Sequence, residues 1–284
     1  MPEGDTIFRT ARTLRAALVD QPVTRVATTV GQVRQLGVER LVGQRVRDVE
    51  PRGKHLLLWF APSDLALHSH MRMSGSWHLY RPGERWRKPR HQARFELEVP
   101  GWVAVCFAAP VIELLSAQQV ARHRVLAGLG PDALDDAPDL GEARRRLDQR
   151  LDWTIGEALL DQGVLAGVGN VFRNEVLFIH RVDPWRRVGD IDGDTRDAIL
   201  ATTVGLMSAN VDADRVRRVT TGTPAPGNEL YVHGRHRRPC RRCQRPIAVA
   251  RQGDLGRLTY WCRSCQGPGE APRMPVRPSP TTPT

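Results

Sequence analysis

Long hydrophobic runs are missing from this sequence. No stretch of about 18 consecutive apolar residues occurs among its 284 residues, which excludes a membrane-spanning helix of ordinary length. The chain does not begin with a signal peptide and contains no internal repeats. We therefore expect a soluble, cytoplasmic protein that has no membrane partner.

Lysine and cysteine are scarce. Lys54 and Lys88 are the only lysines among 42 basic residues. In so arginine-rich a chain, an isolated lysine suggests a position whose function an arginine side chain could not perform. Cysteine occurs five times. Cys106 stands alone in an apolar run, and we expect it to be a small, buried core residue.

The other four cysteines lie close together near the C-terminus. Their spacing is Cys240-x₂-Cys243-x₁₈-Cys262-x₂-Cys265. Paired CxxC turns supply two thiolates from each side of a tetrahedral ion, which predicts one structural Zn²⁺. A cytosolic compartment also favours thiolate–zinc binding over disulfides.

The charge balance is strongly basic, with a formal net charge of +11 and a pI of about 10.5. Within residues 231–266, nine arginines accompany a single acid, Asp254. A metal-pinned element with this much positive charge favours nucleic acid as the partner. Charge alone leaves ribosomes and membrane surfaces as alternatives.

The order of patterns along the chain predicts an α+β multidomain protein. Residues 1–130 show an N-terminal helix followed by short alternating runs, which predict a β-sandwich or barrel. The acidic segment 131–148 is interpreted as a linker, and residues 149–230 have helical periodicity. Residues 231–266 form the predicted zinc finger. Residues 267–284 are rich in proline, as is typical of a disordered tail.

The individual elements follow from these periodicities. Asp5 or Thr6 is expected to cap the first helix, and Asp5 is the favoured cap. Strands are predicted at residues 23–30, 45–50, 55–60, 65–70, 95–99 and 102–107. Later helices are predicted at residues 151–165, 171–179 and 195–210.

The N-terminus carries a chemically suggestive motif, Met1-Pro2-Glu3-Gly4-Asp5. Removal of Met1 would leave Pro2 with a free secondary amine, and an α-amine with a pKa of about 7.7–8.0 is partly neutral at physiological pH. Such an amine forms an iminium with a sugar aldehyde carbon, and Glu3 could act as general acid or base there. Because many proteins begin with Met-Pro, the motif alone does not identify an enzyme.

A glycine-rich turn separates two helical patterns near the middle of the chain. Gly167 and Gly169 permit close approach of backbone N–H groups to an anion, and Asn170 could cap the next helix. The alternative is an ordinary helix–turn–helix connection. Glu175, on the second helix, is expected to be a structural hydrogen-bond acceptor.

Four motifs occur in a diagnostic order: Pro2-Glu3-Gly4, the run His68-Ser69-His70-Met71-Arg72-Met73-Ser74-Gly75, the turn Gly167-Val168-Gly169-Asn170, and the cysteine quartet. Together, over roughly residues 2–266, they closely resemble the formamidopyrimidine-DNA glycosylase / endonuclease VIII family of base-excision repair enzymes. The resemblance implies a helix–two-turn–helix in the helical domain. It also implies a monomeric, bacterial, nucleoid-associated enzyme whose partner is damaged DNA, double- or single-stranded.

The resemblance assigns roles to particular residues. Pro2 would be the Schiff-base nucleophile at the sugar C1′ and Glu3 the proton donor. Lys54 would contact phosphate and donate a proton in β-elimination, and Arg257 would do so in δ-elimination. The implied DNA-binding residues are His70, Arg72, Met73, Gly167 and Asn170. Of these, Arg72 and Met73 would fill the space left by a flipped nucleotide. Zinc would build the finger and take no part in the chemistry.

The segment 220–230 bears on which damaged base is preferred. It is too short to form the long lid that 8-oxoguanine-preferring members of the family close over a flipped purine. This favours an endonuclease VIII-like enzyme for oxidised pyrimidines. The alternatives are an 8-oxoguanine/formamidopyrimidine-preferring glycosylase and a catalytically silent damaged-DNA binding protein. A zinc-ribbon transcription or translation factor would explain the finger but not Pro2, Lys54 and Asn170 together. Most relatives have proline in place of Asp5, whose carboxylate could instead raise the pKa of the Pro2 amine.

Overall fold

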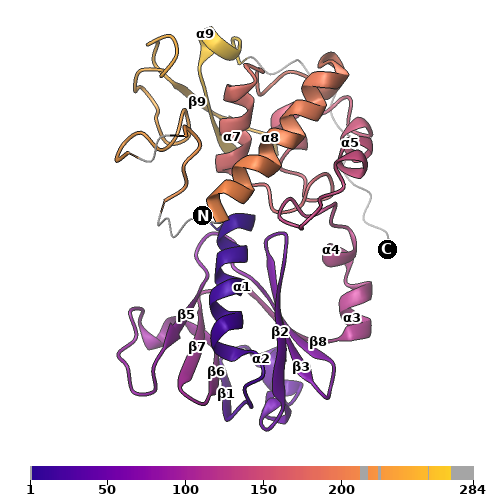
Figure 1. Ribbon diagram of the computed structural model, residues 1–284, viewed down its shortest axis with the longest axis vertical. Helices are drawn as coiled ribbons and strands as arrows, with labels where there is room; N and C mark the ends of the chain where they lie inside the picture. The colour runs from indigo at the N-terminus through magenta and orange to yellow at the C-terminus, as the bar shows by residue number, and fades with distance from the viewer. Residues whose placement is uncertain (1, 212–216, 223–224, 255, 270–284) are drawn as a thin grey trace. The chain divides into compact units, whose positions relative to one another are not determined.

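The computed structural model describes residues 2–211, 217–222, 225–254 and 256–269 (Figure 1). The chain divides into two compact units. The first contains residues 1–138, 165–168 and 207–214, and the second contains residues 139–164, 169–206 and 215–284. Most of the predicted tail, residues 270–284, lies outside the described residues, as does Met1. Among the described residues, no helix combines the length and apolar character needed to span a bilayer.

The first unit contains helix α1 (Gly4–Leu18) and two four-stranded antiparallel sheets. One sheet has the order β2 (Arg45–Arg52), β3 (His55–Ala61), β4 (Leu65–His70) and β8 (Val111–Ser116). The other has the order β1 (Arg25–Thr28), β6 (Ala93–Val99), β7 (Trp102–Phe107) and β5 (Ser76–Tyr80). Short helices complete it: α2 (Gly31–Gln35), η1 (Val38–Leu41), η2 (Arg90–Gln92), α3 (Ala117–Arg122) and α4 (Arg124–Ala127).

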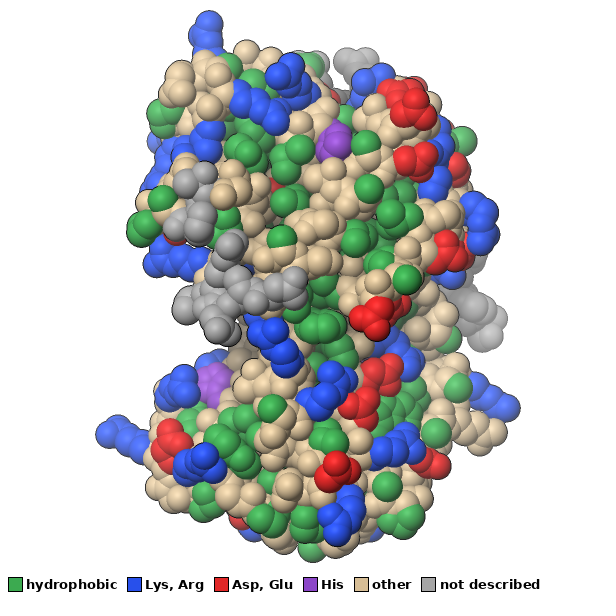
Figure 2. Space-filling model, viewed as in Figure 1, with side chains coloured by type: hydrophobic (Ala, Val, Ile, Leu, Met, Phe, Trp, Pro, Cys, Tyr) green, Lys and Arg blue, Asp and Glu red, His purple; other side chains and the backbone are tan. Residues whose placement is uncertain are grey.

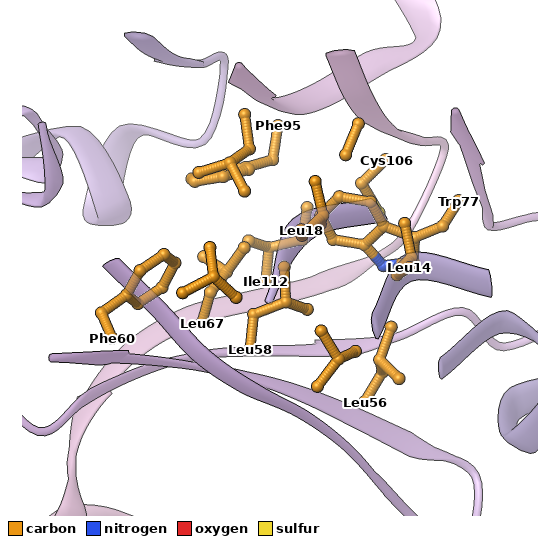
Figure 3. Packing of buried hydrophobic residues seen from close by; sticks show 14 of the residues in the cluster. Leu14, Leu18, Leu56, Leu58, Phe60, Leu67, Trp77, Phe95, Cys106 and Ile112 are labelled. Carbon is orange, nitrogen blue, oxygen red and sulfur yellow. The ribbon is translucent and has the colours of Figure 1, made fainter. Parts of the chain in front are cut away.

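Both sheets and α1 contribute to one main hydrophobic core. Figure 3 shows side chains from α1 (Leu14, Leu18), from the β2–β8 sheet (Leu56, Leu58, Phe60, Leu67, Ile112) and from the β1–β5 sheet (Trp77, Phe95, Cys106). Cys106 is fully buried in this core, and burial raises the pKa of its thiol. The prediction that Cys106 is a buried core residue is therefore confirmed.

The second unit is mainly helical and ends in a two-stranded hairpin. Its elements are α5 (Leu140–Asp148), α6 (Ile155–Ala158), α7 (Asn170–Ile179), η3 (Val188–Asp190), α8 (Gly193–Val211), β9 (Ala248–Gln252), β10 (Arg257–Trp261) and α9 (Arg263–Gln266). The last residues of α8 belong to the first unit. Helix α5 occupies part of the segment that was interpreted as a linker.

The helix predicted at residues 151–165 is wrong in its extent. Only α6, a single turn, forms there, and the chain then follows an irregular path. Leu159, Val164 and Leu165 are fully buried although they are not helical. Apolar residues buried along an irregular segment can reproduce helical spacing by chance, which explains the error.

Candidate active site

The N-terminal segment is held by backbone contacts. Glu3 precedes α1 as its N-cap residue and is fully buried, while Pro2 is half-buried. The amide of Gly4 donates a 2.9 Å hydrogen bond to the carbonyl of Gly167. A Cβ on Gly4 would lie 2.9 Å from the Gly167 Cα and 2.8 Å from the Met207 Cε. Only glycine fits at this position, and its close packing fixes where Pro2 lies.

Asp5 is not the cap of α1, contrary to prediction. It lies inside the first turn, where acidic residues favour the positive end of a helix. Its carboxylate is fully buried, accepts a hydrogen bond from the Thr6 hydroxyl and pairs with Arg9 at 3.4 Å. Because Glu3 adopts the extended N-cap backbone conformation, the helix begins two residues earlier than a cap at Asp5 would give.

A second segment, the turn between β2 and β3, approaches the same place. Gly53 has a φ of +58°, and a Cβ there would lie 3.1 Å from the Ala166 Cβ and 3.3 Å from the Gly167 nitrogen. Lys54, the next residue, is half-buried. The structure thus brings the segments 2–4, 53–54 and 166–167 together around the backbone of Gly167.

Asp132 organises this junction, a role that was not predicted from the sequence. Its carboxylate accepts hydrogen bonds from the backbone N–H groups of Gly53 and Leu134. Burial raises its pKa, while these two hydrogen bonds lower it. The flanking backbone pairs with Ala166, which donates to Pro131 O at 2.8 Å and accepts from Ala133 N at 3.1 Å. A single carboxylate therefore links the Lys54 turn to the Gly167 segment.

The loop after β4 presents the two residues predicted to fill a vacated base position. Met71 is buried, whereas Arg72 is exposed and Met73 is 61% exposed. Arg72 has a φ of +44°, and Gly75 N donates to Met71 O at 2.8 Å. A Cβ on Gly75 would lie 2.7 Å from that same carbonyl oxygen, so only glycine permits the tight turn. The turn directs Arg72 and Met73 outward while Met71 anchors it.

His70, at the end of β4, belongs to a column of histidines. It lies opposite His55 on β3, with ring centroids 4.5 Å apart. His55 Nδ1 lies 2.8 Å from His68 Nε2. Burial lowers the pKa of His55 to about 2, and burial together with Lys54 lowers the pKa of His70 to about 4. Both imidazoles are therefore neutral at neutral pH.

The column ends at Glu113 on β8. Its carboxylate lies 2.7 Å from His68 Nδ1 and 3.3 Å from His123 Nε2. These three residues are chemically able to bind a metal, but tetrahedral zinc would separate its ligand atoms by about 3.3 Å. The 2.7 Å contact is instead a hydrogen-bond distance. His123 Nδ1 also accepts from Leu126 N, so its Nε2 carries a hydrogen that faces Glu113.

The second unit holds Asn170 and Arg257 close together. Asn170 begins α7 and is not its cap, because Gly169 takes that position. The Asn170 amide donates to Leu258 O at 2.8 Å, and its oxygen accepts from the buried guanidinium of Arg173 at 2.5 Å. Arg173 also donates to Leu258 O at 3.1 Å. Two side chains from α7 thus hold the backbone of the hairpin residue that follows Arg257.

Glu175 is a structural acceptor, as predicted. Its buried carboxylate accepts hydrogen bonds from the Thr220 hydroxyl and from the backbone N–H groups of Tyr231, Val232 and His233. Burial raises its pKa, whereas these hydrogen bonds lower it. The carboxylate therefore fixes the chain where it enters the cysteine-bearing segment.

The four cysteines form a cluster that can hold a metal ion. Their Sγ atoms all lie within 4.8 Å of one another. The Cys240–Cys265 and Cys243–Cys262 sulfur distances are 3.9 Å and 3.4 Å. Tetrahedral zinc with bonds of about 2.3 Å places sulfur atoms about 3.8 Å apart, so the cluster suits this ion.

The predicted site residues are distributed over both units. Those in the first unit are Pro2, Glu3, Lys54, His70, Arg72, Met73 and Gly167, and those in the second are Asn170, Arg257 and the four cysteines. In chemical terms, the first unit offers a buried carboxyl group and an ammonium group and, once Met1 is removed, the amine of Pro2. The second offers an amide and a guanidinium beside a basic metal-binding segment. These groups suit imine chemistry and phosphate binding.

Two family models match the chain. The formamidopyrimidine-DNA glycosylase N-terminal domain matches residues 1–109, and the formamidopyrimidine-DNA glycosylase H2TH domain matches residues 129–220. Probable endonuclease 8 2 of Streptomyces coelicolor is 42% identical over 98% of this chain and 99% of its own. A DNA-(apurinic or apyrimidinic site) lyase of Mycolicibacterium smegmatis is 36% identical over 94% and 99%. Endonuclease 8 of Escherichia coli is 32% identical over 94% and 100%.

Solved structures show the same fold. A complex of Lactococcus lactis Fpg with DNA containing N7-benzyl-Fapy-dG has a TM-score of 0.79 and 23% identity, and covers 93% of this chain and 99% of that one. A complex of that enzyme with DNA containing an oxidised pyrimidine has a TM-score of 0.79 and 22% identity, with the same coverage. The predicted fold class is confirmed: an N-terminal helix with β-sheets, a helical domain and a C-terminal four-cysteine element.

Proposed function

Because the chain belongs to the formamidopyrimidine-DNA glycosylase family, we propose that it is a bifunctional base-excision repair enzyme. It excises an oxidised base from DNA as a glycosylase and then cleaves the strand as an AP lyase, with Pro2 as the nucleophile. The observation that carries this proposal is the convergence of Pro2–Gly4 and the Lys54 turn on the backbone of Gly167.

The reaction proceeds in three steps. The Pro2 nitrogen bonds to the sugar C1′ while the bond from C1′ to the base breaks, and Glu3 supplies a proton that opens the sugar ring. The iminium then acidifies the C2′ proton, whose loss expels the 3′ phosphate in β-elimination. A second elimination expels the 5′ phosphate, and hydrolysis of the imine frees Pro2. Lys54 and Arg257 are the proposed proton donors to the departing phosphates.

The other predicted site residues are proposed to bind and position the DNA. Lys54, His70 and Gly167 are the contacts proposed from the first unit, and Asn170 is the contact proposed from the second. Arg72 and Met73 occupy the space of the flipped nucleotide. Their outward orientation on a tight turn supports this role, since a wedge must leave the protein surface to enter the base stack.

Oxidised pyrimidines are the proposed substrates. Relatives named endonuclease 8 support this choice, and so does the small number of residues in the segment 220–230. In that segment Thr220 N donates to Glu229 O at 2.8 Å, and the Thr221 hydroxyl donates to Asn228 O at 2.6 Å. Residues 223–224 lie outside the described residues. The pairing of residues 220–221 with residues 228–229 leaves little chain to fold over a purine.

One structural Zn²⁺ is proposed for the cysteine quartet. Its role is to hold the turn at Cys240–Cys243 against the segment Cys262–Cys265, which flank the hairpin that carries Arg257. The proposed enzyme is a monomer in the bacterial cytoplasm.

Borohydride trapping tests the proposal. Protein lacking Met1 is mixed with a duplex that contains an abasic site, and borohydride then reduces any imine to a stable adduct. We expect a covalent protein–DNA complex from the wild type and none from Pro2→Gly or from an N-terminally extended chain. If both variants form the adduct as the wild type does, Pro2 is not the nucleophile. A wild type that binds the duplex but never forms the adduct would instead be a catalytically silent binder.

A further inference from the structure

A basic loop, residues 81–92, joins β5 to β6 and is not used in the proposed reaction. Five of its first ten residues are basic, and Glu84 is its only acid. The basic residues are Arg81, Arg85, Arg87, Lys88 and Arg90. Lys88 is one of the two lysines of the chain, the other being Lys54 of the proposed site. Figure 2 shows Lys and Arg side chains on the visible face of the first unit.

The basic loop crosses one face of its sheet. β5 pairs antiparallel with β7, so Tyr80 lies opposite Val103 and Ser76 opposite Phe107. β6 also pairs with β7, and its first residue, Ala93, lies opposite Phe107. The loop therefore leaves β5 at one end of β7 and rejoins the sheet at the other end. Such a path spreads its side chains over the length of the strand.

A tryptophan anchors the basic loop on that face. Trp86 is half-buried and stacks on Tyr80, with ring centroids 6.0 Å apart and planes 26° apart. It also meets Phe107 edge to face, with centroids 5.6 Å apart. Arg90 lies over the Trp86 ring, with its guanidinium carbon 4.5 Å from the centroid. These contacts hold the middle of the loop against the sheet.

The basic side chains of this loop have no carboxylate partner among the described residues. In the described part of the chain, no ion pair involves Arg85, Arg87, Lys88 or Arg90. The carboxylate of Glu84 accepts a hydrogen bond from the backbone of Arg81 instead. Residues 83–90 also line a surface hollow. Four cations without carboxylate partners, grouped around a hollow, suit an external polyanion.

The end of the basic loop adjoins the loop that presents Arg72 and Met73. Gln92 O accepts a 2.8 Å hydrogen bond from Ala108 N, and Ala108 O accepts one of 3.2 Å from the Ser74 hydroxyl. Ser74 directly follows Met73. Two hydrogen bonds through a single residue therefore connect the basic loop to the proposed base-replacing loop.

We propose that the basic loop binds the phosphate backbone of DNA that flanks the damaged nucleotide. This inference rests on the proposed function, because it takes DNA as the partner. A duplex held at Arg72 and Met73 continues beyond them, and phosphates recur along it about every 1.7 Å of axis when both strands are counted. The basic loop adjoins the loop of Arg72 and Met73 and would place its cations along the flanking phosphates. It would bind without reading sequence, since phosphate contacts carry no base information.

Salt dependence tests the proposal directly. Each neutralised phosphate contributes about 0.9 to the slope of log affinity against log salt concentration. The variant R85A/R87A/K88A keeps Arg90 on Trp86, and we expect its slope to be smaller than that of the wild type by about 2.7. Between 50 and 200 mM salt, the ratio of the two affinities should therefore change by about 40-fold. The probe is an undamaged 30-base-pair duplex, measured by fluorescence anisotropy.

A matched control removes three exposed arginines elsewhere on the same unit, in R12A/R40A/R122A. It changes the net charge equally, and we expect it to keep most of the wild-type slope. Equal slopes in the two triple variants would overturn the proposal. So would an unchanged DNA slope in R85A/R87A/K88A accompanied by lost binding of an acidic polyglutamate peptide, which would identify a protein partner. Failure of the proposed function is scored separately, by borohydride trapping with the wild type.

Discussion

The amide of Gly4 donates a hydrogen bond to the carbonyl oxygen of Gly167 at 2.9 Å. Gly4 has no room for a side chain, and Gly167 has a φ of +91°, a conformation that favours glycine. A Cβ added to Gly4 would lie 2.9 Å from the Gly167 Cα, and a Cβ added to Gly167 would lie 3.5 Å from the Gly4 Cα. The nucleophile proposed for this protein is two residues from Gly4. Its position is therefore set by backbone packing, which side-chain substitutions elsewhere do not readily alter.

The first prediction concerns this contact. Gly4→Ala should lower the free energy of unfolding by about 1–3 kcal/mol, since the new methyl group meets backbone that cannot move aside. It should also reduce the yield of borohydride-trapped adduct, because Pro2 is displaced. Gly31→Ala is the matched control, since a Cβ there meets nothing within 4 Å. Urea unfolding and trapping measure both effects; similar behaviour of the two variants would contradict the packing role.

The second prediction concerns the histidine column. An unfolded histidine titrates near 6.5. In the folded protein the pKa is lowered to about 2 for His55 and about 4 for His70, chiefly by burial, with further lowering from neighbouring histidines and Lys54. Between about pH 6.5 and pH 4 the unfolded chain therefore binds more protons, and the free energy of unfolding should fall as the pH falls.

His55→Gln tests this pH dependence because it removes one histidine of the column. We expect a shallower loss of stability between pH 6.5 and pH 4 than in the wild type, measured by urea unfolding across that range. His91→Gln, which changes an exposed histidine outside the column, should keep the wild-type slope. Equal slopes in the two variants would mean that the column does not cause the acid sensitivity.

The sequence predicted several elements well. The bounds of β4 and β7 match their predicted ranges, since turns at Asp64 and Gly101 delimit them. Strands β5 and β8 were not predicted. The segments of the proposed site were recognisable from residue types and order. Their junction was not, because Asp132 contacts Gly53 across 79 residues and lies in a segment that composition alone marks as a linker.

The third prediction concerns Glu175. Glu175→Gln replaces one acceptor oxygen by an NH₂ group that faces backbone donors, so at least one buried N–H loses its partner. We expect a loss of about 2–3 kcal/mol in the free energy of unfolding. Glu39→Gln, at an exposed position, is the control and should have little effect. If chemical denaturation gives the same midpoint for both, the carboxylate does not organise this segment.

The fourth prediction concerns the metal. Purified protein should contain one zinc per chain by elemental analysis, and Cys243→Ser should lose it, because three thiolates and a hydroxyl bind zinc less well. Cys106→Ala removes a cysteine outside the cluster and should retain the metal. Zinc-free wild type with normal DNA affinity would contradict a structural role for the ion.

The fifth prediction separates Lys54 and Arg257 from the bulk of the basic surface. Lys54→Ala and Arg257→Ala should each reduce the salt slope of duplex binding by about one, because each removes one proposed phosphate contact. They should also slow strand cleavage after the imine has formed, since both residues are proposed proton donors to the departing phosphates. Arg12→Ala removes the same charge from an exposed position and should slow no chemical step. Single-turnover cleavage of an abasic duplex at saturating protein makes the comparison, because saturation removes the effect on affinity. If Lys54→Ala cleaves as fast as Arg12→Ala under these conditions, Lys54 contributes binding alone, and the proton in β-elimination must come from another group.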